Sequence, residues 1–89
     1  MRIVEVIGDF KICRTSRKYI LINCKGGYEN HAHFDSLKGA KYCLEFKEKK
    51  IKPKNQYFRD ALIRLVGESE FLTYREESIK QKYKNRYNH

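Results

Sequence analysis

The sequence predicts an α+β domain, in which a small antiparallel β-meander of three or four strands is followed by two or three helices packed on one face. Three observations support this fold class. As far as residue 35, apolar residues alternate with polar ones or form short β-branched runs. After residue 36 they recur with helical spacing. Turn signals rich in Gly, Asp and Ser separate the short runs, as is typical of hairpins.

Four short segments carry the strand signal, and turns separate them. We expect strands at residues 2–7, 10–14, 18–24 and 28–34. Gly8-Asp9 separates the first two segments, and Thr15-Ser16-Arg17 is a plausible turn before the third. Lys25-Gly26-Gly27 is the clearest hairpin turn in the chain. The four strands are therefore expected to form an antiparallel meander.

The first helix is expected to begin directly after the sheet. Asp35 or Ser36 can cap it, because both side chains carry an oxygen that can accept from the first backbone N–H groups. Its apolar side runs from Leu37 to Phe46, and it ends in the charged residues 47–50. Pro53 forbids its continuation, so residues 49–55 are expected to form a linker.

The second helix has the strongest helical pattern. Asn55 can cap it, its broad apolar stripe spans residues 57–66, and Gly67 stops it. Glu68 and Glu70 then begin a third helical segment, where the helix dipole favours acidic residues. The weak apolar side of that segment is formed by Phe71, Leu72, Ile79 and Tyr83. Its basic C-terminal end is expected to fray.

Length and cysteine content limit the classes that the chain can belong to. With 89 residues, it is expected to form one domain, 1–89, in which 1–35 is mainly strands and 36–89 mainly helices. A signal peptide and a membrane span are not expected, and a cytoplasmic location follows. Three cysteines cannot all pair internally, so reduced thiols are expected, with Cys13 and Cys43 as buried small hydrophobes.

A polar strand face stands out between residues 29 and 35. On an extended strand, Glu29, His31, His33 and Asp35 share one face. Two imidazoles and two carboxylates can bind a metal, and the fragment 31–35 echoes part of a metallo-hydrolase motif. However, Ser36 stands where that motif has a further His. A solvated polar face is therefore the favoured interpretation, and a metal site is the alternative.

A structural zinc site would need a further ligand beside these side chains. Cys24 can supply it across the hairpin, or Cys43 from the first helix, which would give a mixed Cys/His set. The spacing matches no standard zinc finger. Nucleophilic catalysis is not favoured either, because no base or oxyanion site accompanies the cysteines.

The strongest signal is charge. Lys+Arg 20 against Asp+Glu 11 gives a net charge of +9, which favours polyanionic or acidic partners. One concentration covers the first helix and the following loop, at Lys38, Lys41, Lys47, Lys49, Lys50, Lys52 and Lys54. The second interleaves cations with tyrosines near the C-terminus, at Tyr74, Arg75, Lys80, Lys82, Tyr83, Lys84, Arg86 and Tyr87. Such a mixture suits RNA or single-stranded DNA, although a solubilising surface is the alternative.

Three segments within residues 27–70 have a distinctive composition: HAHF at 31–34, SLKGAK at 36–41 and YFRDALIRL at 57–65, and KYKNR at 82–86 is similar in character. Through them, residues 27–70 resemble small uncharacterised proteins of Gram-positive bacteriophages and mobile elements. The resemblance implies no established activity and no site residues. It implies a stoichiometric binder of host machinery, such as an anti-CRISPR-like inhibitor of a defence complex. Such a role needs a rigid surface and no active site.

These observations together predict a non-catalytic, basic binding protein that occludes a nucleic-acid or host nucleoprotein target, with no cofactor and no membrane partner. Arg59 and Arg64 lie away from the apolar face of the second helix and can reach an anion. The expected contact residues are Arg59, Arg64, Arg75, Lys80, Lys82, Tyr83, Lys84, Arg86 and Tyr87, with Tyr83 and Tyr87 as stacking groups.

Two alternative functions remain open. The first is a small metal-binding protein or metal-dependent hydrolase that uses the strand face of His31, His33 and Asp35, with Cys24. The second is a DNA-binding regulator of winged-helix type, whose second and third helices place Arg75 near a groove. A homodimer is also open, because an exposed hairpin edge or the side formed by residues 71–79 can pair protomers.

Overall fold

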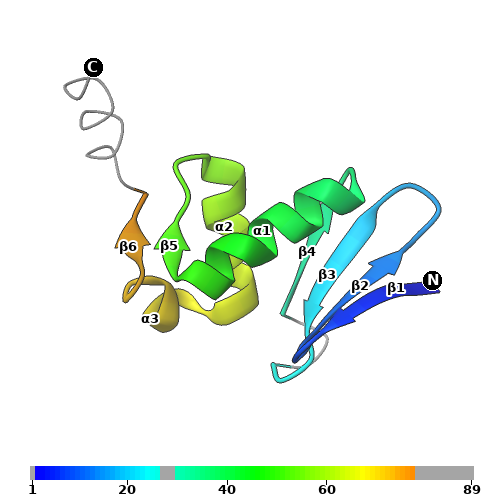
Figure 1. The fold of residues 1–89 in the computed structure, drawn as a ribbon, viewed down its shortest axis with the longest axis horizontal. Coiled ribbons are helices and arrows are strands. Elements are labelled where there is room, and N and C mark those ends of the chain that lie inside the picture. The colour runs from blue at the N-terminus through cyan, green and yellow to red at the C-terminus, as the bar shows by residue number, and fades with distance from the viewer. Residues whose placement is uncertain (1, 27–29, 78–89) are drawn as a thin grey trace, which may run out of the picture.

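The computed structural model describes residues 2–26 and 30–77 and confirms the predicted α+β class (Figure 1). Four antiparallel strands come first, and three helices and two very short strands follow. The strands are β1 (Arg2–Ile7), β2 (Phe10–Arg14), β3 (Tyr19–Asn23), β4 (His31–Phe34), β5 (Ile51–Lys52) and β6 (Arg75–Glu76). The helices are α1 (Leu37–Lys49), α2 (Gln56–Val66) and α3 (Glu68–Phe71).

The main sheet is a simple meander in the order β1-β2-β3-β4. Ile7 pairs with Phe10 across a two-residue turn, in which Gly8 has φ +57°, a value that favours glycine. The turn after β2 is closed by Thr15, whose N–H donates to the Lys18 carbonyl over 2.8 Å. A register shift between Ile3 and Glu5 puts a bulge into β1, the edge strand of the sheet. The meander is therefore confirmed, with its edge strand distorted.

Capping side chains fix where α1 and α2 begin. Ser36, not Asp35, caps α1, because its Oγ accepts from the Gly39 N–H over 3.0 Å. Asn55 caps α2, and its Oδ1 accepts from the Tyr57 N–H over 2.8 Å. The Asn55 cap is therefore confirmed, and of the two caps predicted for the first helix, Ser36 is the one used.

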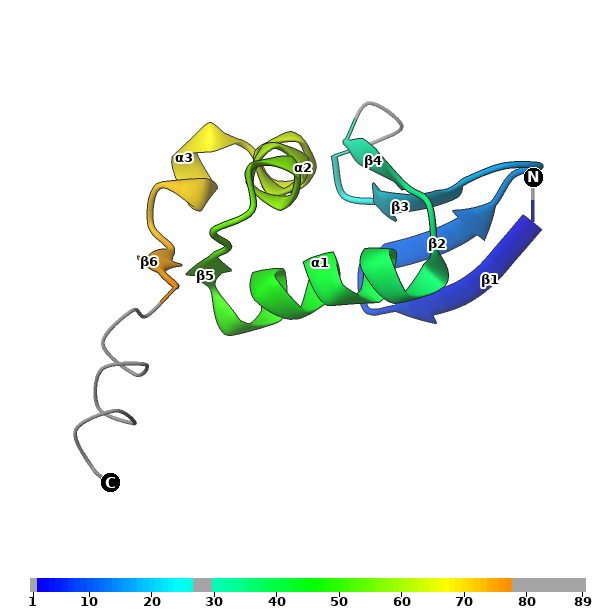
Figure 2. The same ribbon diagram turned by 90° about the horizontal axis from the view of Figure 1, so that it is seen from above.

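The helices enclose one side of the sheet. In Figure 2, α1 runs along one face and α2 lies beside β4. The side-chain amides of Asn23 and Asn30 donate to the Leu65 carbonyl over 2.9 and 3.3 Å, which ties the last turn of α2 to the sheet. These bonds supply a partner for a carbonyl that has no partner inside the helix.

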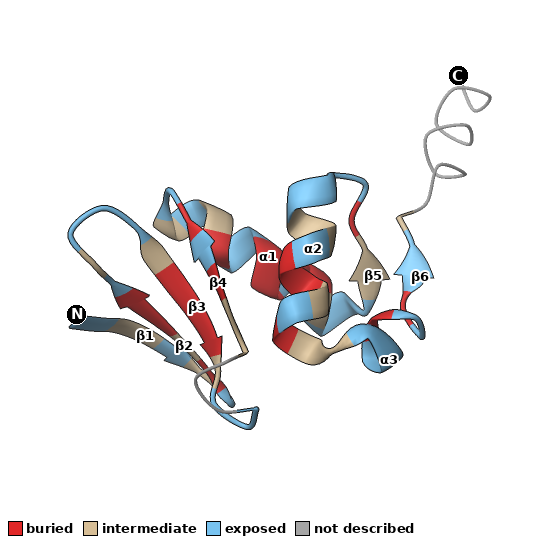
Figure 3. Ribbon diagram, turned by 180° about the vertical axis from the view of Figure 1, so that it is seen from behind, coloured by how far each residue is buried: buried red, intermediate tan, exposed pale blue. Residues whose placement is uncertain are grey.

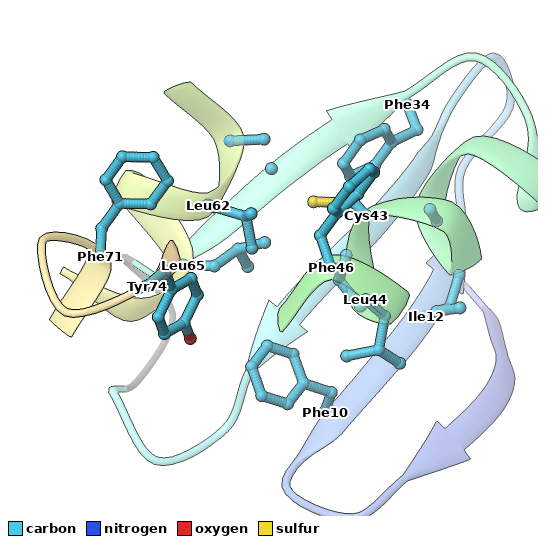
Figure 4. Packing of buried hydrophobic residues seen from close by; sticks show 14 residues of the cluster. Phe10, Ile12, Phe34, Cys43, Leu44, Phe46, Leu62, Leu65, Phe71 and Tyr74 are labelled. Atoms are coloured by element: carbon cyan, nitrogen blue, oxygen red, sulfur yellow. The ribbon is translucent and has the colours of Figure 1, made fainter. Parts of the chain in front are cut away.

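The core fills the space between these layers (Figure 4). Inward residues of the sheet meet the apolar sides of the helices, and the buried residues in Figure 3 gather there. The largest contributors include Phe10, Ile12, Phe34, Cys43, Leu44, Phe46, Leu62, Leu65, Phe71 and Tyr74. Cys13 lies on the opposite face with Ile20 and Ile22 in a second small cluster. Cys13 and Cys43 are both buried and unpaired, as predicted.

The linker predicted at residues 49–55 is partly wrong. Lys50 ends α1 in the left-handed conformation, with φ 55°, and β5 follows at once. β5 pairs in parallel with β6, through bonds from the Arg75 and Glu77 N–H groups to the Lys50 and Lys52 carbonyls. Pro53 is buried beyond it. Local pattern cannot reveal this pairing, because its two strands have two residues each and lie far apart in the sequence.

The prediction of a long third helix is also wrong within the described residues. α3 ends at Phe71, and a turn leads into β6, which carries Arg75. Burial of Phe71 and Tyr74 outweighs the local helical tendency, because the turn brings both rings into the core. A four-residue α3 does not provide the recognition helix that a winged-helix arrangement needs. Ile79 and Tyr83 lie outside the described residues.

Candidate functional site

The lysines of the first predicted concentration form a surface whose charge is partly neutralised. This lysine surface comprises Lys38, Lys41, Lys47, Lys49, Lys50, Lys52 and Lys54. Four of them have acidic partners, in the pairs Lys41–Glu5 (2.9 Å), Lys47–Glu48 (3.8 Å), Lys49–Glu45 (2.8 Å) and Lys52–Glu76 (3.5 Å). Each pair cancels much of the field that a phosphate would meet.

Arg59, one of the predicted contact residues, supports the fold around α3. Its guanidinium donates to the Pro53 carbonyl over 3.0 Å and to Glu76 Oε1 over 3.1 Å. It also lies over the Phe71 ring, 5.4 Å from the centroid, and Lys52 approaches the same ring to 5.6 Å. Arg59 therefore has a structural role that the spacing on α2 did not reveal.

The other predicted contact residues are dispersed. Arg64 stands in the last turn of α2 near His33, and Arg75 is exposed on β6. Neither has an acidic partner among the residues that the structure describes. The remaining six, Lys80, Lys82, Tyr83, Lys84, Arg86 and Tyr87, lie outside the described residues.

The sheet places two arginines side by side, and a third stands in the adjacent turn; none of the three was predicted from the sequence as a contact residue. Arg2 is the cross-strand partner of Arg14, and Arg17 stands in the adjacent turn between β2 and β3. All three are exposed, and within residues 2–26 and 30–77 none of them has an acidic partner. We call Arg2, Arg14 and Arg17 the arginine end. Only the strand register shows that the first two are neighbours.

Sheet geometry explains why the arginine end is open. The cross-strand row Arg2, Arg14, Tyr19, Phe34 passes from exposed arginines to a fully buried ring. The helices cover the Phe34 end of this row, so its β1 end remains accessible. Arg14 lies over the Tyr19 ring, 5.5 Å from the centroid. Like charges directly opposite each other, such as Arg2 and Arg14, destabilise a sheet. Unfavourable local arrangements of this kind are found mainly at functional sites.

The strand face with the histidines has the predicted alternation. His31 and His33 face away from the helices, with ring centroids 5.1 Å apart, while Ala32 and Phe34 are buried. Burial lowers the pKa of His33 below its usual value, and the neighbouring His31 and Arg64 lower it further. Glu29 lies outside the described residues.

The other proposed metal ligands do not join these imidazoles. Asp35 forms an ion pair with Lys18, and Cys24 is exposed in the turn after β3. Cys43 lies in the core on the helix side of the sheet, where burial raises the pKa of its thiol to about 12. In the described part of the chain, no three His, Cys, Asp or Glu side chains gather closely enough to hold a metal ion.

A shallow cleft of about 390 Å³ opens where the sheet meets the ends of α1 and α2. Its charged groups are Asp9, Lys25, Lys47, Lys50 and Glu70. Lys25 and Asp9 are 3.6 Å apart, and Lys47 lies over the Phe10 ring at 5.0 Å. The Glu70 carboxylate accepts from the Tyr74 hydroxyl over 2.6 Å. Asp9, Lys25, Lys47 and Glu70 therefore already have partners, and neither His nor Cys lines the cleft.

Comparison of the chain with protein-family models, curated proteins and solved structures finds no match. None of the helices formed by the described residues has the length and apolar character that crossing a lipid bilayer requires.

Proposed function

We propose that this protein is a non-catalytic binding protein that docks on the phosphates of a nucleic acid, free or within a nucleoprotein. The arginine end is the surface that makes the first contact. The observation that carries the proposal is the pair Arg2 and Arg14, placed side by side in the sheet without an acidic partner in the described ranges. Guanidinium groups bind phosphate oxygens through two parallel hydrogen bonds.

The overall charge supports the same target class. The net charge is +9, and residues 78–89 add four cations and no acid to the end of the chain. A strongly basic protein attracts nucleic acid from a distance, while only the unpaired cations remain available for direct contacts. Together with the resemblance to bacteriophage proteins, this makes a host defence nucleoprotein of the CRISPR type the physiological target that we propose.

Fluorescence anisotropy against labelled RNA and DNA over a salt series tests the proposal. The wild-type protein should bind with an affinity that falls steeply as salt rises. The double substitution R14Q/R17Q should weaken binding and reduce the log–log salt slope by about 0.7 to 0.9 for each arginine. The domain should remain folded, because both side chains are exposed.

The matched control removes two positive charges that already have acidic partners. K25Q/K49Q changes the net charge by the same amount, but Lys25 pairs with Asp9 and Lys49 with Glu45. Its affinity should stay close to that of the wild type. Equal losses in the two variants would mean that net charge alone drives binding, and this would overturn the role of the arginine end.

A further inference from the structure

An exposed group of aromatic rings bridges α1 and α2. Tyr42 on α1 and Tyr57 on α2 are 47% and 54% exposed, although both are large rings. Each meets Phe58 edge to face, with centroid distances of 5.3 Å from Tyr42 and 5.8 Å from Tyr57. We call Tyr42, Phe58 and Tyr57 the aromatic ledge. It belongs to the described body of the protein, whereas the sequence suggested stacking groups only near the C-terminus.

Contacts with neighbouring residues hold the rings of the aromatic ledge in place. Phe58 stacks on the buried Phe34 at 5.9 Å, and Tyr42 packs edge to face on Phe46 at 4.9 Å. The Tyr57 hydroxyl donates to the His33 carbonyl, so its ring is fixed against β4. Rings that are already ordered lose little conformational entropy when a ligand stacks on them.

Cations without acidic partners flank the aromatic ledge. Lys38 precedes Tyr42 by one turn of α1, and Arg64 follows Tyr57 by two turns of α2, so each cation shares a helix face with a tyrosine. Neither cation forms an ion pair with any residue in the described part of the chain.

Two of the three nearby carboxylates are paired with lysines, and the third accepts a hydrogen bond from an amide. The Glu45 carboxylate is 2.8 Å from Lys49, and Asp60 accepts from the Gln56 amide over 2.8 Å. Asp35 is paired with Lys18. The surface therefore combines exposed rings with unpaired positive charge, which is the complement of a ligand that has flat rings and phosphates.

We propose that the aromatic ledge stacks the unpaired bases of a single-stranded nucleic acid, while Lys38 and Arg64 contact its phosphates. This inference rests on the proposed function and names the strand type. In a duplex the bases stack on one another and are not available to protein rings, whereas a single strand presents them. The arginine end contacts phosphates of either strand type, so the aromatic ledge supplies the preference between them.

Binding of single-stranded and duplex oligonucleotides of one sequence, as RNA and as DNA, tests this inference. Y42L/Y57L keeps apolar side chains but removes both planar rings. Its affinity for the single strand should fall about tenfold or more, as expected when stacking on one base is lost. Its duplex affinity should not change. A 2-aminopurine base in the single strand should be quenched by the wild type and not by this variant.

The matched control Y42F/Y57F keeps both rings and removes the hydroxyl groups, including the Tyr57 donor to His33. It should retain the wild-type preference for single strands and the quenching. If Y42L/Y57L remains folded by circular dichroism and keeps that preference, the inference is overturned. Salt-dependent binding without any preference for single strands would also overturn the aromatic ledge, yet leave the proposed function intact. Failure to bind every probe at low salt would overturn the proposed function itself.

Discussion

The lysine surface and the arginine end carry charge of the same sign, but they differ in what surrounds it. On the lysine surface, four of the seven ammonium groups lie within 4 Å of a carboxylate, and Lys52 also rests on the Phe71 ring. At the arginine end, Arg2 and Arg14 are side by side with no acid beside them in the described ranges. A smaller fraction of the denser run of cations in the sequence is therefore available in the fold.

This difference shows that charge density along a chain is a poor guide to a binding surface. Acidic residues on α1 are spaced for pairing with its lysines, as Glu45 is, four residues before Lys49. Arg2 and Arg14 stand twelve residues apart and are neighbours only because β1 and β2 pair.

The largest expected effect comes from removing the Phe71 ring, which lies beneath Lys52 of the lysine surface. Phe71 is 3% exposed and carries Lys52 and Arg59 on its ring. Phe71→Ala should lower the free energy of unfolding by about 3–5 kcal/mol, because it leaves a cavity in the core. Denaturant unfolding followed by circular dichroism measures this loss.

Phe71→Leu keeps most of the buried volume and serves as the control for that variant. It should lose less stability and should bind nucleic acid as the wild type does, because the arginine end lies elsewhere. If F71A unfolded at the same denaturant concentration as the wild type, the Phe71 ring would not be supporting this region.

The sequence was sufficient for the parts of the fold that local rules determine. β1 and β2 have the predicted bounds, Ser36 and Asn55 cap the helices, and α2 stops before Gly67. Each of these features depends on residues within a few positions of one another. The β5–β6 pair and the short α3 depend instead on the burial of Phe71 and Tyr74, which a local pattern cannot show.

The candidate site was less predictable for the same reason. Arg64 was predicted correctly to lie away from the core, whereas Arg59 turned out to be bound to Glu76 and Pro53. No sequence pattern indicated that Arg2 and Arg14 are neighbours, because their proximity follows from the strand register. The two-residue turn that joins Ile7 to Phe10 fixes the register only as far as Glu5. The bulge between Ile3 and Glu5 then shifts the pairing by one residue and brings Arg2 opposite Arg14, which the sequence does not indicate.

A smaller effect is expected from a substitution at the arginine end. Arg2→Glu places a carboxylate opposite Arg14, so like-charge repulsion becomes attraction. The domain should gain about 0.2–1 kcal/mol of stability and lose affinity for nucleic acid. Thermal unfolding and anisotropy on the same sample measure both effects. Lys49→Glu is the control with equal charge change, and it should bind more tightly than R2E. Loss of stability in R2E would contradict the repulsion between Arg2 and Arg14.

The smallest effect tests whether the ion pairs of the lysine surface hold β6 in place. A hydrogen bond from Arg59, together with the charge of Lys52, lowers the pKa of Glu76 below its usual value of 4.5. Because the folded pKa is the lower one, the stabilisation is present above the unfolded pKa and is lost as pH falls through the folded value. Exchange of the Arg75 and Glu77 amides should therefore be constant near neutral pH and show extra acceleration only below the usual glutamate range, after correction for intrinsic rates. Glu76→Gln should remove this acid-dependent acceleration of exchange. If E76Q still showed the acceleration, another carboxylate would be responsible for it.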